Sequence, residues 1–520
     1  MTRCESPHAV GTLGTVAVTA PSPAVARSAA SAGDRVAPNI LLIVSEDTGT
    51  QLSCYDDPVV KTPHLDVLAS RGVRFEAAYV TQAGCSSSRA SIFTGLYPHQ
   101  NGQIGLATHK FRMFRGDYPN LPSLLRANGY RTGVIGKIHV NPEETFEWDF
   151  KERPKYNLFG HRDVAKVADL AASFIGADDA RPFFLMVNYS DTHKPFLRQD
   201  AGLPARPFGP GDVKTLPFVG HDSPETLQTV ADYYNCVSRL DTGCGMLLDC
   251  LDRAGKTDNT LVIYLGDHGP ELARGKMTCY EGGVRVPFVL SFPGRIPPGT
   301  ADNYLVSMID LLPTILDAAR IQPPPNLPGQ SLLPLLDGRS SSWRQYLFTE
   351  FTVHMPSAYY PSRTVRDERY KLIHNLLWRR PNPIYRHYLV DRLPPHLTPE
   401  DIESAPSQVR RTYNIFRQPP QFELYDLQTD PWEFDNLSDD PAYGGVLERL
   451  RGALDRWQEE TNDALRHPAM LDRLTTEIES VYSFDKHEYE GVNYKKEGFE
   501  WEYSGYFLET QPGGKRDKGE

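Results

Sequence analysis

Residues 39–47 read NILLIVSED, in which a continuous apolar run leads directly into polar residues. An apolar run of this length, without alternation, is typical of a β-strand that is buried on both faces in a parallel sheet. Glu46 and Asp47 would then lie at the carboxyl end of this strand. Because ligands of open α/β sheets bind outside this edge, the stretch predicts both the sheet and the location of its functional site.

Three further stretches repeat the pattern of a buried strand followed by polar residues. One polar residue after a strand is usually a turn or cap former, but four clusters with complementary chemistry at one sheet edge predict a shared site. The predicted strands and the polar residues behind them are 260–265 with Asp267 and His268, 131–136 with Lys137 and His139, and 182–189 with Asp191 and His193. The helices predicted between the strands are 62–71, 121–128, 162–175 and 224–254. This alternation of strands and helices predicts an α/β fold.

The polar residues divide by charge into two groups. Carboxylates suit a hard divalent cation, whereas basic side chains suit an anion. Because no cysteine or histidine group has zinc-like spacing, we expect calcium, with magnesium as the alternative. The expected metal ligands are Glu46, Asp47, Asp267 and His268, and the expected anion contacts are Arg89, Lys137, His139, His193 and Lys276.

A cysteine opens the stretch at residues 85–95, which reads CSSSRASIFTG. The serines after Cys85 weakly favour a helix start, where exposed backbone amides bind an anion. A lone cysteine is more often a small buried core residue. The stretch by itself leaves both interpretations open.

The same stretch resembles the signature of the type I sulfatases of the alkaline phosphatase superfamily, in which the cysteine is oxidised to formylglycine. Ser87 stands where proline or alanine is usual. The resemblance covers residues 38–465, with the blocks TPHLD (62–66), YPHQNG (97–102), RTGVIGKIH (131–139) and YEGGVRVP (280–287). It implies an alkaline phosphatase-like mixed, mostly parallel sheet flanked by helices, with a smaller C-terminal antiparallel α+β subdomain.

The resemblance also implies a role for each candidate residue. Cys85, as formylglycine, would supply a hydrated aldehyde whose hydroxyl attacks sulfur. This formylglycine would also be a calcium ligand, beside Glu46, Asp47, Asp267 and His268, although Glu46 and His268 stand where aspartate and asparagine are common. The remaining roles are stabilisation of formylglycine by Arg89, deprotonation of the hydrate with His139, sulfate contacts from Lys137, His193 and Lys276, and protonation of the leaving group by His193.

Within the family, the similarity is greatest to the heparan N-sulfatases, or sulfamidases. It rests on NGQIGL (101–106), GKIHV (136–140) and RYKLIHNL (369–376), whereas Lys276 replaces an arginine of those enzymes. The resemblance implies hydrolysis of a sulfate ester or sulfamate on a glycosaminoglycan-type or other sulfated carbohydrate. One alternative is a phosphomonoester or phosphonate hydrolase, which the Asp267-His268 pair keeps open. Another is a non-catalytic sulfoglycan-binding protein, should Ser87 prevent oxidation of Cys85.

Four segments are expected along the chain. Residues 1–37 read as a secretion signal or a disordered extension, 38–340 as the catalytic domain and 341–465 as the C-terminal subdomain. The tail at 466–520 is aromatic and acidic, with disorder expected only at 513–520. We expect this tail to pack on the body or on a neighbouring subunit, which leaves a homodimer open.

The composition limits the classes of partner. The chain has 520 residues, 40% of them hydrophobic, and a net charge of -11, which argues against a nucleic-acid binder. No apolar run is long enough for a membrane span, and the seven cysteines suggest no disulfide framework. The expected partners are a sulfated carbohydrate and a formylglycine-generating maturation enzyme. The expected location is periplasmic or extracellular if residues 1–37 are a signal, and cytoplasmic otherwise.

Overall fold

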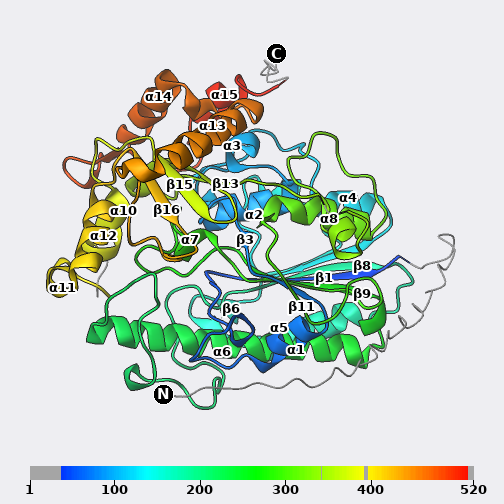
Figure 1. The fold of residues 1–520 in the computed structure, drawn as a ribbon. Coiled ribbons are helices and arrows are strands. Elements are labelled where there is room, and N and C mark those ends of the chain that lie inside the picture. The colour runs from blue at the N-terminus through cyan, green and yellow to red at the C-terminus, as the bar shows by residue number, and fades with distance from the viewer. Residues whose placement is uncertain (1–36, 341, 392–395, 513–520) are drawn as a thin grey trace, which may run out of the picture. The chain divides into compact units, whose positions relative to one another are not determined.

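Four buried strands lie side by side in a computed structural model of the chain, which describes residues 37–340, 342–391 and 396–512 (Figure 1). They are β1 (Asn39–Ser45), β4 (Arg131–Ile135), β8 (Phe183–Tyr189) and β9 (Thr260–Gly266). Strand β1 pairs in parallel with both β8 and β9, and β4 pairs in parallel with β8. Their carboxyl ends therefore meet at one edge, as predicted. The expected N-terminal extension, up to residue 36, and the stretch 513–520 lie outside the described residues.

Shorter strands extend this sheet to eight on its two sides. Strand β5 (Phe150–Glu152) is parallel to β4, whereas β10 (Phe288–Ser291) is antiparallel to β9. Beyond β10 lie β2 (Val73–Phe75) and β11 (Thr300–Asp302). The mixed, mostly parallel sheet confirms the predicted fold class.

Each face of the sheet carries its own hydrophobic core, because successive side chains of a strand point to opposite faces. Leu41 and Ile43 of β1 pack into one core, and Ile40, Leu42 and Val44 into the other. Figure 1 shows α5 and α6 on one face and α2 and α8 on the other. The helices of the first face are α1 (Pro63–Ser70), α5 (Val164–Ile175) and α6 (Pro224–Arg253), and those of the second are α2 (Cys85–Thr94), α4 (Leu121–Ala127) and α8 (Leu311–Ala318).

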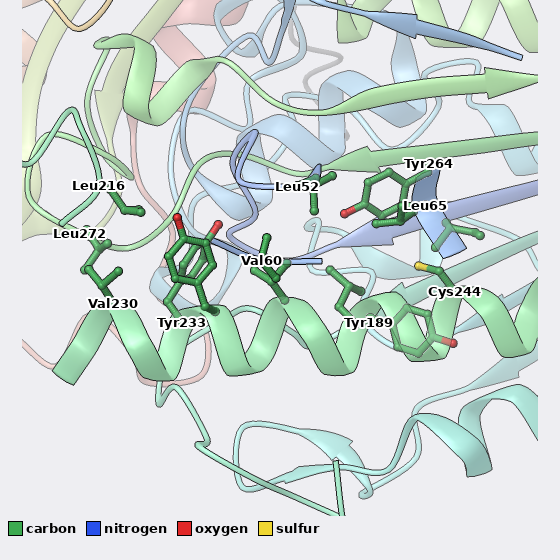
Figure 2. Packing of buried hydrophobic residues seen from close by; sticks show 14 of the residues in the cluster. Leu52, Val60, Leu65, Tyr189, Leu216, Val230, Tyr233, Cys244, Tyr264 and Leu272 are labelled. Atoms are coloured by element: carbon green, nitrogen blue, oxygen red, sulfur yellow. The ribbon is translucent and has the colours of Figure 1, made fainter. Parts of the chain in front are cut away.

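The core beside α6 shows how closely strands and helices approach each other. Figure 2 shows Tyr189, Tyr264 and Cys244 among the apolar side chains of this core. Gly133 in β4 has no side chain, and a Cβ there would lie 2.7 Å from the ring of Phe174 in α5. A glycine at this position therefore lets α5 pack directly on the strand.

The C-terminal part forms a second sheet, which is antiparallel throughout. Its strands are β13 (Leu347–Val353), β14 (Tyr359–Arg366), β15 (Tyr370–Asn375) and β16 (Phe422–Asp426). Helix α13 (Gly444–Glu460) packs on β14 and β15. This arrangement confirms the predicted smaller antiparallel α+β part. The other helices here are α10 (Pro383–Arg386), α11 (Pro399–Ser404), α12 (Ser407–Arg417), α14 (Pro468–Glu479) and α15 (Tyr503–Leu508).

The aromatic tail packs on the body through side chains that also form hydrogen bonds. Trp501 Nε1 donates to the carbonyl oxygen of His109 at 2.8 Å. Tyr503 Oη donates to the carbonyl oxygen of Arg112 at 2.9 Å, and its ring lies 5.8 Å from that of Phe111. The tail thus covers the segment 109–112, in keeping with its aromatic content. Within the described residues, no helix combines the length and the apolar character of a membrane span.

A buried ion pair joins the second sheet to the segment that follows α13. Arg363 and Asp463 are almost fully buried, with Nε–Oδ2 and Nη2–Oδ1 distances of 2.6 and 3.0 Å. Burial would raise the pKa of Asp463, but Arg363 and His99 hold it below its usual value. A carboxyl with a lowered pKa stabilises the fold above its ordinary pKa, and this contribution is lost as the pH falls.

We expect Asp463→Asn to lower the free energy of unfolding by about 3 kcal/mol at neutral pH, because Arg363 would be left buried without its counter-charge. The difference from the wild type should shrink in acid, below a pH of about 4. Denaturant titrations at several pH values measure both effects. Asp439→Asn, at an exposed position, is the control and should change nothing. Equal stability of the two variants would contradict this assignment.

Candidate active site

Helix α2 begins at Cys85, in agreement with the helix start predicted there. Gly84 precedes it in an extended conformation, and the helix ends at Gly95, which adopts a left-handed φ of 69°. Glycine is the residue that most readily accepts this conformation at the end of a helix. Ile92 and Phe93 of α2 pack into the core above the sheet, so Cys85 is held on a rigid element at 2% exposure.

Basic groups surround the thiol of Cys85. Its Sγ lies 3.3 Å from Nε2 of His268. Burial would raise the pKa of this thiol, but Lys137, Lys276 and His268 together hold it well below its ordinary value. The environment at position 85 therefore stabilises negative charge, as a site for an anionic substrate must.

Two carboxylates lie beside the same thiol. The backbone N–H of Asp47 donates to Oδ1 of Asp267 at 2.9 Å, and Lys276 Nζ lies 2.8 Å from Asp47 Oδ2. The other oxygen, Asp47 Oδ1, is buried and accepts no hydrogen bond from any residue that the structure describes. One ligand atom each from Asp47, Cys85, Asp267 and His268 lies within 4.8 Å of the others. The nearest basic atom to this oxygen in the cluster is Nε2 of His268, at 3.5 Å. A buried carboxylate oxygen without a hydrogen bond in such a cluster fits a divalent cation.

His268 lies between the carboxylates and the thiol. Burial would lower its pKa, but Asp267, Asp47 and Cys85 raise it to about 9. Its Nδ1 contacts the carbonyl oxygen of Gly269 at 2.9 Å, which directs Nε2 toward the cluster. As a metal ligand His268 would have to be neutral, so a bound cation and a proton on Nε2 exclude each other.

Arg89 links the cluster to the neighbouring strands and is fully buried. Its Nη2 lies 3.0 Å from Oδ2 of Asp267, and its Nη1 donates to Oδ1 of Asn188 at 2.7 Å. Gly136 follows β4 with φ 96°, and a Cβ there would lie 2.3 Å from the carbonyl oxygen of Asn188. Only glycine allows β4 and β8 to end this close together, which brings Lys137 to the site.

Lys137 contacts the first of the predicted acidic ligands. Its Nζ lies 2.7 Å from Oε2 of Glu46. Burial would raise the pKa of Glu46, but Lys137, Arg89 and His193 lower it. Glu46, Asp47 and His193 form a second group of ligand atoms close enough to hold an ion.

Two histidines, His139 and His193, are less buried than the other predicted site residues and differ in their surroundings. Nδ1 of His193 contacts the carbonyl oxygen of Lys194 at 2.6 Å, so this carbonyl engages Nδ1 and not Nε2. Burial would lower the pKa of His193, but Asp47 raises it. His139 has φ 60°, and neither ring nitrogen has a hydrogen-bond partner within the described part of the chain. Burial and Lys137 lower the pKa of His139, which favours the neutral imidazole.

Sequence reasoning missed two residues beside this site. Asn188 is the lone amide in the apolar strand β8, and that exception was the available signal. His354 is buried, and a Cβ on Gly84 would lie 3.3 Å from its Nδ1. Burial and Lys276 hold the pKa of His354 well below its usual value. It follows β13 of the antiparallel sheet, to which the rule for parallel strand ends does not apply.

The structure thus brings all the predicted site residues to one place at the carboxyl edge of the central sheet. The catalytic or metal-ligating roles expected for them remain predictions. The residues are Glu46, Asp47, Cys85, Arg89, Lys137, His139, His193, Asp267, His268 and Lys276.

Comparisons with known proteins found similar families and relatives. Residues 38–321 match the family described as Sulfatase, and residues 271–385 match the family described as N-sulphoglucosamine sulphohydrolase, C-terminal. The chain is 33% identical to N-sulphoglucosamine sulphohydrolase of Homo sapiens, over 82% of this chain and 90% of that protein. It is 31% identical to an ulvan-active sulfatase of Formosa agariphila, over 82% of this chain and 81% of that protein.

The fold has relatives among solved structures. One is BT4656, solved in complex with its substrate D-glucosamine-2-N,6-O-disulfate. Its TM-score is 0.62 at 20% sequence identity, over 82% of this chain and 99% of that chain. At this level of identity, the likeness concerns the fold alone.

Proposed function

Since this chain belongs to the sulfatase family of sulfuric ester hydrolases, we propose that it removes sulfate from a glycosaminoglycan-type carbohydrate, with N-sulfated glucosamine as the leading candidate. The observation that carries this proposal is the position of Cys85, at a helix start between two lysines and two carboxylates. The name of the human relative supports the sulfamate linkage, and that of the Formosa relative supports sulfated polysaccharides more generally.

The family implies two chemical groups at this site, a formylglycine and a metal ion. Oxidised to formylglycine by a maturation enzyme, the residue at position 85 would supply a hydrated aldehyde as the nucleophile. We propose calcium as the ion, because carboxylate oxygens of Asp47 and Asp267 are hard ligands. Bound there, the ion would neutralise charge on the sulfate oxygens.

The basic side chains would bind and orient the sulfate. Lys137 and Lys276 flank position 85 and are each held by a carboxylate, Glu46 and Asp47 respectively. Both ammonium groups therefore have fixed positions before the substrate arrives, which is the preorganisation that favours charge development in the transition state. Arg89, held by Asp267 and Asn188, would fix the position of Asp267 in the site.

The two histidines would transfer protons in opposite directions, one as a base and the other as an acid. His139, whose lowered pKa favours the neutral form and which has no hydrogen-bond partner among the described residues, would accept a proton from the nucleophilic hydroxyl. His193, with its Nδ1 held by a carbonyl oxygen, would donate a proton from Nε2 to the departing oxygen or nitrogen. Opposite pKa shifts of two groups in one site agree with this division into base and acid.

A substrate comparison tests the proposal against its rival, a phosphonate or phosphomonoester hydrolase. We expect kcat/KM for N-sulfoglucosamine or a sulfate ester of glucosamine to exceed that for a phosphonate monoester by about 10²-fold. The protein should be produced both with and without a formylglycine-generating enzyme, and only the first preparation should turn over. Preference for the phosphonate monoester would overturn the proposal. Binding of sulfated sugar without turnover in both preparations would favour a binding protein instead.

A further inference from the structure

An aromatic ring lies exposed beside the proposed acid of the reaction. Phe159 is the most exposed large apolar side chain among the residues that the structure describes, at 49%. Its ring centroid lies 4.6 Å from that of His193, with an angle of 35° between the two rings. Phe159 therefore covers one flank of His193 while about half of its own surface faces solvent.

The segment that presents Phe159 is firmly anchored. Phe159 lies in the turn between β6 (Asn157–Leu158) and β7 (His161–Arg162). Asn157 Nδ2 donates to the carbonyl oxygen of Asn188 at 2.7 Å, and its Oδ1 accepts from the backbone N–H of Ser190 at 3.1 Å. These bonds tie the start of the hairpin to the end of β8, next to the active site.

The other strand of the hairpin is tied to the loop that carries His193. Arg162 is 1% exposed, and its Nη2 donates to the carbonyl oxygen of His193 at 2.9 Å. The same guanidinium lies 3.3 Å from the buried carboxylate of Asp191, which Arg239 also binds at 2.7 Å. Phe159 and His193 therefore share one rigid support, and their relative position is fixed by buried contacts.

The reaction itself determines what lies next to this ring. Nδ1 of His193 is engaged by the carbonyl oxygen of Lys194, so Nε2 is the nitrogen that faces the substrate. The atom that links sulfate to its sugar must lie within hydrogen-bond distance of this Nε2, about 3 Å. The sugar ring attached to that atom then comes within reach of Phe159.

We propose that Phe159 is a binding platform for the sugar ring that carries the sulfate, and that the ring stacks its C–H face on the phenyl group. The C–H face of a pyranose is apolar, so stacking removes apolar surface of both partners from water. The polarised C–H groups also face the electron-rich face of the aromatic ring. This inference rests on the proposed function, since it takes a sulfated carbohydrate as the substrate.

The test compares three variants on the sulfated sugar that the wild type hydrolyses. Phe159→Ala and Phe159→Leu should raise KM about 10-fold and leave kcat within about twofold, because they remove the flat ring. Phe159→Trp, which keeps an aromatic face, should retain a KM close to that of the wild type. Inorganic sulfate, which lacks the sugar, should inhibit all variants with the same inhibition constant. Val390→Ala, at another exposed apolar position, is the control.

Several outcomes would overturn the inference. An unchanged KM in Phe159→Ala, with normal turnover by the wild type, would refute the platform and leave the proposed function intact. A fall in kcat with unchanged KM, or weaker inhibition by inorganic sulfate, would show that Phe159 acts through His193 instead. Failure of the wild type to hydrolyse any sulfated sugar would overturn the proposed function and the platform together.

Discussion

Replacing Cys85 with alanine is expected to lower kcat for sulfate release by at least about 10⁴-fold, because the variant loses the side chain that we propose as the precursor of the nucleophile. The fold should be unaffected, since alanine is the best helix former and Cys85 starts α2. Sulfate release by the purified variant, with circular dichroism and thermal unfolding as folding checks, measures the effect.

Cys54→Ala provides the matched control. Cys54 is also a buried free thiol, but burial raises its pKa to about 12, and the charged groups that act on it, Asp66, Arg74 and Asp241, are not predicted site residues. The opposite pKa shifts of Cys54 and Cys85 indicate that the basic surroundings of Cys85 are particular to that position. Loss of activity in Cys54→Ala would point to general destabilisation. Retained activity in Cys85→Ala would place the nucleophile elsewhere.

The second large effect concerns Asp267, which belongs to the proposed metal-ligand group and also contacts Arg89. Asp267→Asn keeps the shape of the side chain but removes its negative charge. Oδ2 of this carboxylate lies 3.0 Å from Nη2 of Arg89, and Oδ1 accepts a hydrogen bond from the backbone N–H of Asp47 at 2.9 Å. We expect loss of bound metal and a fall in kcat on the order of 10³-fold, because both the ion and the guanidinium lose their counter-charge. Elemental analysis after dialysis measures the metal content, and a sulfate-release assay measures kcat.

Asp258→Asn, at an exposed position before β9, is the control for this experiment. Removal of the ion from the wild type with a chelator should abolish activity, and calcium should restore it better than magnesium. Full metal content and normal turnover in Asp267→Asn would contradict the assignment of Asp267. Better restoration by magnesium would contradict only the choice of calcium.

The central strands and the location of the site were predictable because both depend on local patterns. The apolar runs of β1, β4, β8 and β9 mark strands that are buried on both faces. Parallel pairing of such strands places all their carboxyl ends at one edge, so the polar residues behind them had to converge. The short outer strands β2, β10 and β11 lacked a comparable signal, because their pairing depends on neighbours that are distant in the sequence.

The parts that sequence reasoning missed depend on long-range contacts. Asn188 meets Arg89 across 99 residues, and nothing in the strand around it predicts that partner. His354 reaches the site from the antiparallel sheet, whose strand ends have no common edge with those of the central sheet.

Peptide mass spectrometry of residue 85, after production with a formylglycine-generating enzyme, shows directly whether Cys85 is oxidised to formylglycine. We expect the peptide to carry an aldehyde in place of the thiol and a hydrazide probe to capture this aldehyde. The aldehyde fraction should scale with sulfatase activity among preparations. An intact Cys85 thiol in a preparation that hydrolyses sulfated sugars would contradict the proposed role of Cys85.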